Sequence, residues 1–203
     1  MGLLTPNAPV VLQPVNPPIG IHLNYCVPTS TVLVLKERLL SFSGDDFTVK
    51  DSNGTPVCLC NARVFSVRDR KVITDLNGNM LYAIHNKLLT FLPEYIGEYP
   101  VSREVFRVKK RWGLGTMMET TFLDSTSNTH ITLTMQGDMW GGSADIMLGP
   151  TVIAQINRSL FNMRQIFGDQ QTYYVSVAPG VDLTLIAAMC ICFDETKNDR
   201  RRR

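Results

Sequence analysis

The stretch from Leu183 to Phe193 limits most strongly how this chain can fold, because it is apolar except for Thr184. Its Ala, Leu and Met residues favour a helix, and Pro179-Gly180 followed by Asp182 is typical of a helix start. A helix that is apolar on every face must be buried on every face. A buried strand stays open as an alternative, because short apolar runs fit both structures.

Two turn sequences predict β-hairpins upstream of this helix. Asp51-Ser52-Asn53-Gly54 and Asp75-Leu76-Asn77-Gly78 each lie between short runs that alternate apolar and polar residues. Asn-Gly is typical of a type I′ turn, whose twist matches antiparallel strands, and the aspartate can cap the turn backbone. Repeated hairpins of this kind need closure to protect their edges.

The rest of the chain shows the same β pattern. We expect residues 93–103 to form a polar loop. The sequence predicts a mainly β fold, a closed antiparallel β-barrel of about a dozen strands around the apolar C-terminal helix. The helix residues expected in the core are Leu183, Leu185, Ile186, Ala188, Met189, Ile191 and Phe193. The other strand candidates are residues 33–40, 64–67, 87–92, 104–110, 117–123, 131–135, 146–147, 152–157 and 173–177.

The two ends of the chain differ in composition from the middle. Six of the prolines fall within residues 1–28, so residues 1–27 are expected to be a flexible, extended arm, with the barrel domain over residues 28–196. Residues 197–203 end in four arginines and are expected to be a solvated basic tail. A nuclear address and a membrane-surface contact stay open as alternative roles for these arginines.

Bulk properties narrow the setting and the partners. The net charge of +2 over 203 residues is too mild to require a nucleic-acid partner. An odd number of cysteines and the lack of a signal-peptide pattern favour reduced thiols and a cytoplasmic location. The longest apolar run is also well short of the roughly 18 residues that span a bilayer.

Several segments of the chain, taken together with their order, resemble the LURP-one-related family, which is similar to the tubby C-terminal domain and to phospholipid scramblases. They are the hairpin at residues 47–54, the Val64-Phe65 strand, the Val152 to Arg158 strand, and, most specifically, Gly168-Asp169 followed by Tyr174 to Asp182 running into the apolar helix. The resemblance covers residues 25–195. It implies a barrel around a hydrophobic helix and no established enzymatic activity.

Catalytic and metal-binding patterns are missing from the sequence. There is no Gly-x-Ser-x-Gly, phosphate-loop or His-Glu-x-x-His motif, so we expect a protein that is not an enzyme and takes no cofactor. Cys58 and Cys60 share a strand face, whereas Cys190 and Cys192 point apart on a helix. The two pairs are therefore expected to pack in the core and to bind no metal.

The remaining chemical signal is a row of cations. On a strand, Arg107, Lys109 and Arg111 project to one face, while Val108 and Trp112 project to the other. We call these three cations the basic stripe. It is a candidate site for phosphate groups, and the tubby resemblance implies a peripheral adaptor for phosphoinositides or other anionic lipids at the plasma membrane.

Other interpretations of the chain stay open. The stripe can equally be a solvated strand face, and the resemblance also admits a scramblase-like membrane protein. A protein-interaction barrel without a lipid ligand is a third possibility. A carrier of lipid-derived small molecules would require a hollow barrel, and the buried helix should fill that space.

Overall fold

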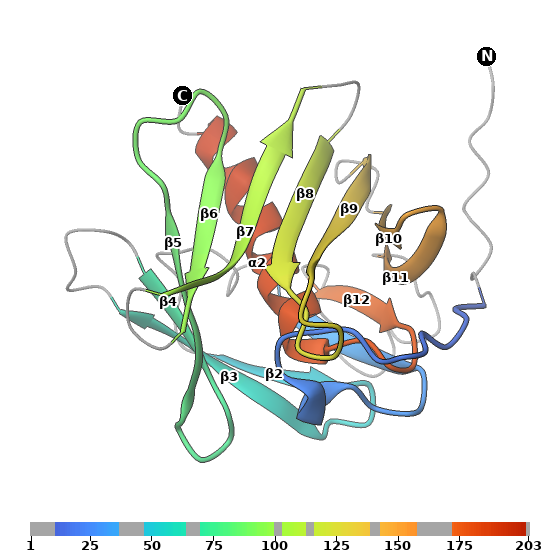
Figure 1. The fold of residues 1–203 in the computed structure, drawn as a ribbon. Coiled ribbons are helices and arrows are strands. Elements are labelled where there is room, and N and C mark those ends of the chain that lie inside the picture. Colours follow the sequence, from blue (N-terminus) through green and yellow to red (C-terminus); the bar gives the residue numbers. More distant parts are fainter. Residues whose placement is uncertain are drawn as a thin grey trace.

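A computed structural model describes residues 11–36, 47–63, 70–99, 103–112, 116–138, 143–157 and 172–201. Its strands form one closed antiparallel barrel in which each strand pairs with the next along the chain and β12 pairs with β1 (Figure 1). This confirms the predicted fold. The strands are β1 (Thr31–Lys36), β2 (Phe47–Asp51), β3 (Pro56–Arg63), β4 (Arg70–Thr74), β5 (Met80–Asn86), β6 (Glu94–Glu98), β7 (Glu104–Arg111), β8 (Thr116–Leu123), β9 (His130–Asp138), β10 (Ser143–Leu148), β11 (Thr151–Asn157) and β12 (Thr172–Val177).

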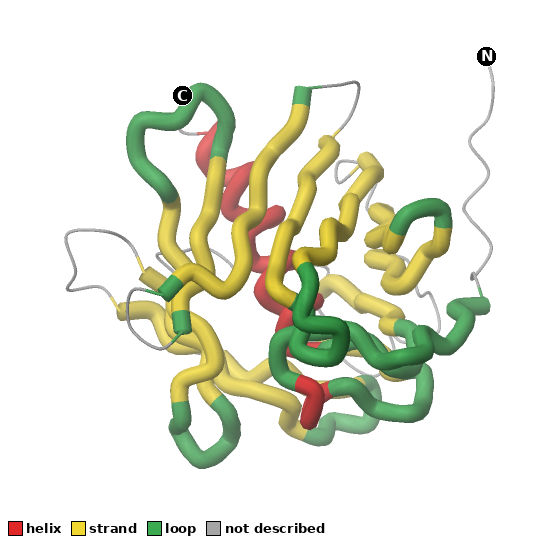
Figure 2. The backbone as a smooth tube through the Cα atoms, viewed as in Figure 1, coloured by secondary structure: helices red, strands yellow, loops and turns green. Residues whose placement is uncertain are grey.

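The C-terminal helix α2 (Leu183–Arg201) runs through the barrel, and Figure 2 shows the strands around it. Each of the seven helix residues expected in the core is at most 3% exposed. They pack against side chains that point inward from the strands, such as Leu33, Phe106 and Leu133. The helix therefore fills the barrel interior, and the alternative of a buried strand is wrong. Among the described residues, no helix has the length and apolarity needed to cross a membrane.

Both predicted hairpins are present, as β2–β3 and β4–β5, but their turns differ from type I′. Only the glycines have positive φ angles, 84° at Gly54 and 86° at Gly78. The Asp51 carboxylate accepts hydrogen bonds from the backbone N–H groups of Asn53 and Thr55, and Asp75 repeats this arrangement. Each ladder also shifts register next to its turn. These features are typical of a longer loop whose glycine forms a bulge.

The strand boundaries differ from prediction on either side of Pro93. Residues 87–92, expected to be a strand, form the connection between β5 and β6, and β6 lies within the expected loop 93–103. Glu94 to Glu98 pair with β7, so cross-strand hydrogen bonding overrides the turn-forming composition of this segment. Residues 37–40 and 64–67 lie outside the described residues.

The expectation of a flexible arm over residues 1–27 is corrected for residues 11–27. This segment packs on the end of the barrel where α2 begins, with Leu12 and Ile19 buried in the core cluster. The Val15 and Ile19 N–H groups donate to the Pro179 and Gly180 carbonyl oxygens, both at 2.9 Å. Its prolines favour an extended chain, and that extended chain is held by contacts distant in sequence. Residues 1–10 lie outside the described residues.

The expected tail at residues 197–203 begins as part of α2, which continues to Arg201. Glu195 and Thr196 are still buried, and the Thr196 hydroxyl donates to Tyr95 Oη in β6 at 3.3 Å. The last part of the helix thus lies at the end of the barrel where β6 starts. Residues 202 and 203 lie outside the described residues.

Enclosure of α2 predicts that Ala188→Asp will prevent stable folding. Ala188 is 0% exposed, and an unpaired carboxylate there costs about 4 kcal/mol or more. Urea denaturation should show this loss, or the variant should fail to accumulate as folded protein. Leu76→Asp is the matched control, because Leu76 is 52% exposed in the β4–β5 turn and should change the free energy of unfolding by about 0.5 kcal/mol or less. Equal stability of Ala188→Asp and wild type would contradict the enclosure of the helix.

Candidate functional site

The basic stripe lies on the outer face of β7, as the alternation predicted. Phe106 and Val108 point inward and are about 1% exposed, whereas Lys109 and Arg111 are exposed and Arg107 is partly exposed. Trp112 differs from prediction. It follows the last residue of β7, is 82% exposed, and does not share the inward face of Val108. Alternation fails at this position because the strand has ended.

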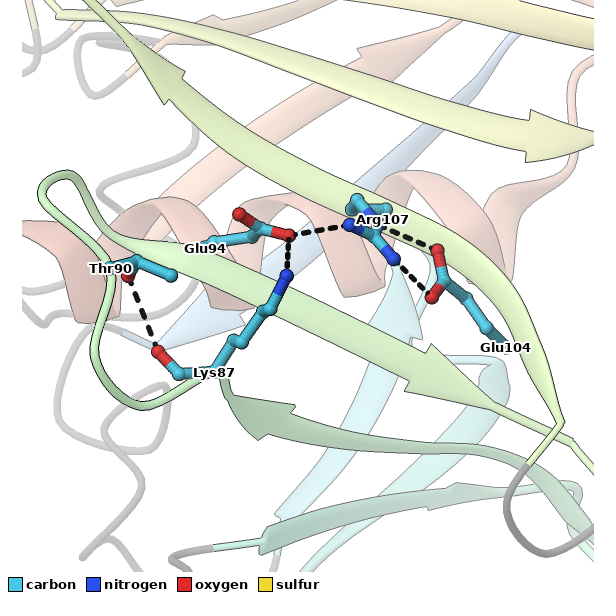
Figure 3. A network of polar contacts seen from close by, with 5 residues as sticks. All are labelled: Lys87, Thr90, Glu94, Glu104 and Arg107. Carbon is cyan, nitrogen blue, oxygen red and sulfur yellow. Dashed lines mark hydrogen bonds and ion pairs between the residues drawn. The ribbon is translucent and has the colours of Figure 1, made fainter.

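Arg107 is held by two carboxylates from separate strands (Figure 3). Its Nε and Nη2 donate to the two oxygens of Glu104 at 2.7 and 2.6 Å, and its Nη1 donates to Glu94 Oε1 at 2.8 Å. The hydrogen bonds from Arg107 lower the pKa of Glu104, and those to Glu104 raise the pKa of Arg107. Lys87 also pairs with Glu94, at 3.1 Å. This group of two cations and two carboxylates is neutral, so Arg107 mainly links β6 to β7.

The other two stripe cations are less constrained. The Arg111 side chain is 55% exposed and reaches Glu119 of β8 at 3.4 Å, a contact that solvent screens strongly. Lys109 lies in register between Glu94 and Glu119, but within the described part of the chain it forms no ion pair. Lys109 and Arg111 are therefore the stripe members that an incoming anion can reach with the smallest loss of existing contacts.

A surface hollow of about 580 Å³ lies over β7 and β8 beside the stripe. Counting three cations and two carboxylates, its charged lining carries a net charge of about +1. The hollow is thus large enough for a small phosphorylated group and only mildly attractive to one. Its ionisable lining residues are Glu104, Arg107, Lys109, Arg111, Glu119 and His130.

The cysteines lie where packing rather than chemistry explains them. Cys58, Cys60, Cys190 and Cys192 are buried, and burial raises the pKa of Cys58 and Cys192. Burial raises the pKa of Cys26 to about 12. The raised pKa values keep Cys26, Cys58 and Cys192 protonated near neutral pH, and a protonated thiol is a poor nucleophile. Among the described residues, no group of three or more His, Cys, Asp or Glu side chains could hold a metal ion.

A second polar cluster surrounds Asp182 at the start of α2, where an enzyme could in principle place a buried acid. Asp182 Oδ2 accepts from His22 N–H at 2.8 Å, Ile21 N–H at 3.1 Å and Tyr82 O–H at 3.2 Å. Asp182 Oδ1 accepts from Thr184 N–H at 2.9 Å and Leu185 N–H at 3.2 Å, as a helix cap does. Six donors including the Thr184 hydroxyl already engage this carboxylate, so it is a structural group.

The neighbours of this cluster are likewise satisfied. Burial raises the pKa of Tyr82, with the Asp182 charge adding to the shift. Burial also acts to raise the pKa of Asp124, but hydrogen bonds from Gly20 N–H and Ser127 outweigh it and the pKa is lowered. The His22 ring packs against the Tyr82 ring in a tilted arrangement, with a centroid distance of 4.8 Å and an interplanar angle of 51°. These contacts attach the N-terminal segment to the barrel.

Sequence reasoning missed the residues that shape the outer site. Glu94, Glu104 and Glu119 come from three strands, and their proximity to the stripe depends on a strand register that the sequence did not supply. It also missed the exposed apolar residues of the β5–β6 connection, because residues 87–92 were expected to be a strand. Pro93 next to a charged strand start was the available signal for a loop there.

The chain is similar to known proteins in both sequence and structure. Residues 31–194 match the LURP-one-related family. The chain is 20% identical to Protein LURP-one-related 15 of Arabidopsis thaliana, covering 87% of this chain and 85% of the relative. It is 26% identical to the YxjI protein of Bacillus subtilis strain 168, and the match covers 80% of this chain and 91% of that relative. An X-ray structure of an Arabidopsis thaliana protein superimposes with a TM-score of 0.61 at 17% identity, covering 87% of this chain and 96% of that one.

The donors around Asp182 predict a large stability loss for Asp182→Ala. The change removes the helix cap and leaves buried N–H groups without an acceptor, at a combined cost of about 3 kcal/mol. Asp51→Ala is the control, because it removes a similar turn-capping carboxylate at a more exposed position and should cost about 1 kcal/mol. Urea denaturation of both variants measures the difference. Equal losses would show that the Asp182 contacts are not worth more than those of an ordinary turn.

Proposed function

The chain belongs to the LURP-one-related family, and from this premise we propose that it is a non-enzymatic peripheral adaptor for anionic phospholipid headgroups, phosphoinositides included. The observation that carries the proposal is the outward position of Lys109 and Arg111 beside the hollow over β7 and β8. We further propose that it acts in the cytoplasm, at the inner surface of the plasma membrane, with a regulatory role.

The chemistry assigns different parts to the three stripe residues. Arg111 can exchange its long contact with Glu119 for a two-pronged contact to a phosphate group, and Lys109 adds a point charge. Arg107 is committed to Glu94 and Glu104, so in this proposal it holds β6 and β7 in place. Each cation near an anionic surface contributes about 1 kcal/mol at low ionic strength, so attachment is weak and salt-sensitive.

Packing of the barrel supports an outer site over the alternatives. The apolar residues of α2 are enclosed by strands and are committed to the core, which disfavours a scramblase-like role that inserts this helix into a bilayer. The same helix occupies the space that a carrier would need for its ligand. A protein-interaction barrel with no lipid ligand is the second candidate, favoured by exposed apolar residues near the end of β7.

The proposal predicts that Lys109→Glu weakens binding to phosphoinositide-containing liposomes by about tenfold or more, since the change reverses one charge near the surface. The double variant Lys109→Glu with Arg111→Glu should abolish pelleting. Pelleting at low and high salt measures both, and circular dichroism and thermal unfolding should stay close to wild type because these side chains are exposed.

Lys50→Glu is the matched control for charge. Lys50 is an exposed lysine on β2, five strands from β7 in one direction around the barrel and seven in the other. Its reversal changes the net charge by the same amount and should leave pelleting within about twofold of wild type. If Lys109→Glu pellets as well as Lys50→Glu and wild type do, the lipid-adaptor proposal loses its residues. The protein-interaction barrel then becomes the better explanation.

A further inference from the structure

Large apolar side chains protrude into solvent at one end of the barrel. Leu88, Leu89 and Phe91 lie in the β5–β6 connection and are 62%, 105% and 101% exposed. Trp112 follows β7 and is 82% exposed. We call these four residues the apolar tips. Single exposed apolar residues are ordinary, but neighbouring ones of this size mark a contact surface.

Hydrogen bonds place the two segments at the same end. Lys87 N–H donates to the Glu94 carbonyl at 2.8 Å, which closes the β5–β6 connection. Lys110 N–H donates to the Pro93 carbonyl at 3.0 Å, so the end of the connection runs beside the end of β7. Trp112 lies two residues beyond Lys110. The apolar tips therefore lie at the same end of the barrel, beyond the ends of the strands.

The apolar tips have basic surroundings. Lys87 begins the connection, and Lys109, Lys110 and Arg111 immediately precede Trp112. The hydrogen bond from the Thr196 hydroxyl to Tyr95 Oη shows that α2 also reaches this end of the barrel. Cations therefore lie beside the apolar tips in both described segments, the β5–β6 connection and the end of β7.

We infer that the apolar tips insert into the headgroup region of an anionic bilayer, so that this end of the barrel faces the membrane. The inference rests on the proposed function and assigns its ligand as a bilayer surface rather than a free headgroup. Protruding Leu, Phe and Trp side chains next to Lys and Arg match the apolar and charged layers of a membrane interface. A protein partner fits less well, because lysine is depleted in protein interfaces.

The backbone of Leu89 is consistent with a functional role for this connection. Its φ angle is 62°, in the left-handed region that residues other than glycine and asparagine seldom adopt. The Leu89 side chain is fully exposed, so packing of this side chain does not offset the unfavourable backbone conformation. An unfavourable conformation that holds an apolar side chain in water suggests selection for contact with something outside the chain.

In this inference the basic stripe attracts the membrane first, and the apolar tips insert afterwards. Lys109 and Arg111 attract the surface over a distance of about 10 Å, and the apolar tips add short-range burial that salt does not screen. Binding through both should retain a salt-resistant part that the charges alone do not provide. Neither signal by itself gives stable attachment.

Trp112 reports insertion directly, because the chain has two tryptophans and Trp140→Phe leaves Trp112 alone. We expect its fluorescence to shift to shorter wavelength with vesicles of three parts phosphatidylcholine to one part phosphatidylserine. Lipids brominated in their acyl chains should quench it. Vesicles of pure phosphatidylcholine should do neither, since they lack the charge that recruits the protein.

Pelleting of variants with native tryptophans provides a second measurement. Leu89→Ser with Phe91→Ser should weaken binding to the same anionic vesicles by about tenfold or more, because it removes two insertable side chains. Leu76→Ser is the control: Leu76 is an exposed leucine in the β4–β5 turn at the opposite end of the barrel, and its change should leave binding unaltered. Circular dichroism should show all three proteins folded.

The outcomes separate this inference from the proposed function. If wild type binds anionic vesicles, Trp112 emission stays unchanged and the double serine variant binds equally well, the inference is wrong and the headgroup site stands. The apolar tips would then be a protein contact. If wild type binds no anionic vesicle at any salt concentration, the proposed function fails and takes this inference with it. A blue shift together with tighter binding than the serine variant supports both.

Discussion

The Asp182 carboxylate is the constraint on which the rest of this barrel depends. It caps α2 through Thr184 and Leu185 and, with its other oxygen, accepts from His22 and Tyr82. One buried group thus joins the helix start, the N-terminal segment and β5. A buried carboxylate is tolerated only when its lone pairs are filled, and three parts of the chain must come together to fill those of Asp182. This requirement fixes where the helix enters the barrel.

Once the helix is fixed, the barrel has little interior left for a ligand. Its strands bury Ile186, Ala188 and Ile191 on all sides, so the apolar surface of the helix stabilises the fold and is not accessible to a ligand. Chemistry is therefore expected on the outer strand faces and at the ends of the barrel. The β7 stripe and the neighbouring apolar tips, the residues of our two proposals, lie in those places.

The sequence predicted features that depend on local pattern and missed those that depend on distant contacts. The helix and the Asp51 and Asp75 turns carry their own signals of composition and spacing. Packing of residues 11–27 could not be foreseen, because it depends on contacts between residues distant in sequence. One of them is Gly20, which lies so close to Asp182 that a Cβ at position 20 would collide with it. The neutralisation of Arg107 likewise needed the register of β6 against β7. The sequence thus predicted the cations of the candidate site but not the carboxylates that surround them.

Native-state hydrogen exchange of the α2 amides tests the enclosure of the helix most directly. If the barrel closes around α2, residues 186–193 can exchange only when the whole domain unfolds. Their free energies of exchange should then equal the global free energy of unfolding from urea denaturation, as should those of the central residues of β8 and β9. Exchange of the helix at a clearly lower free energy than these strands would show that α2 leaves the barrel while the strands stay folded. That result would contradict the enclosure of α2 by the barrel.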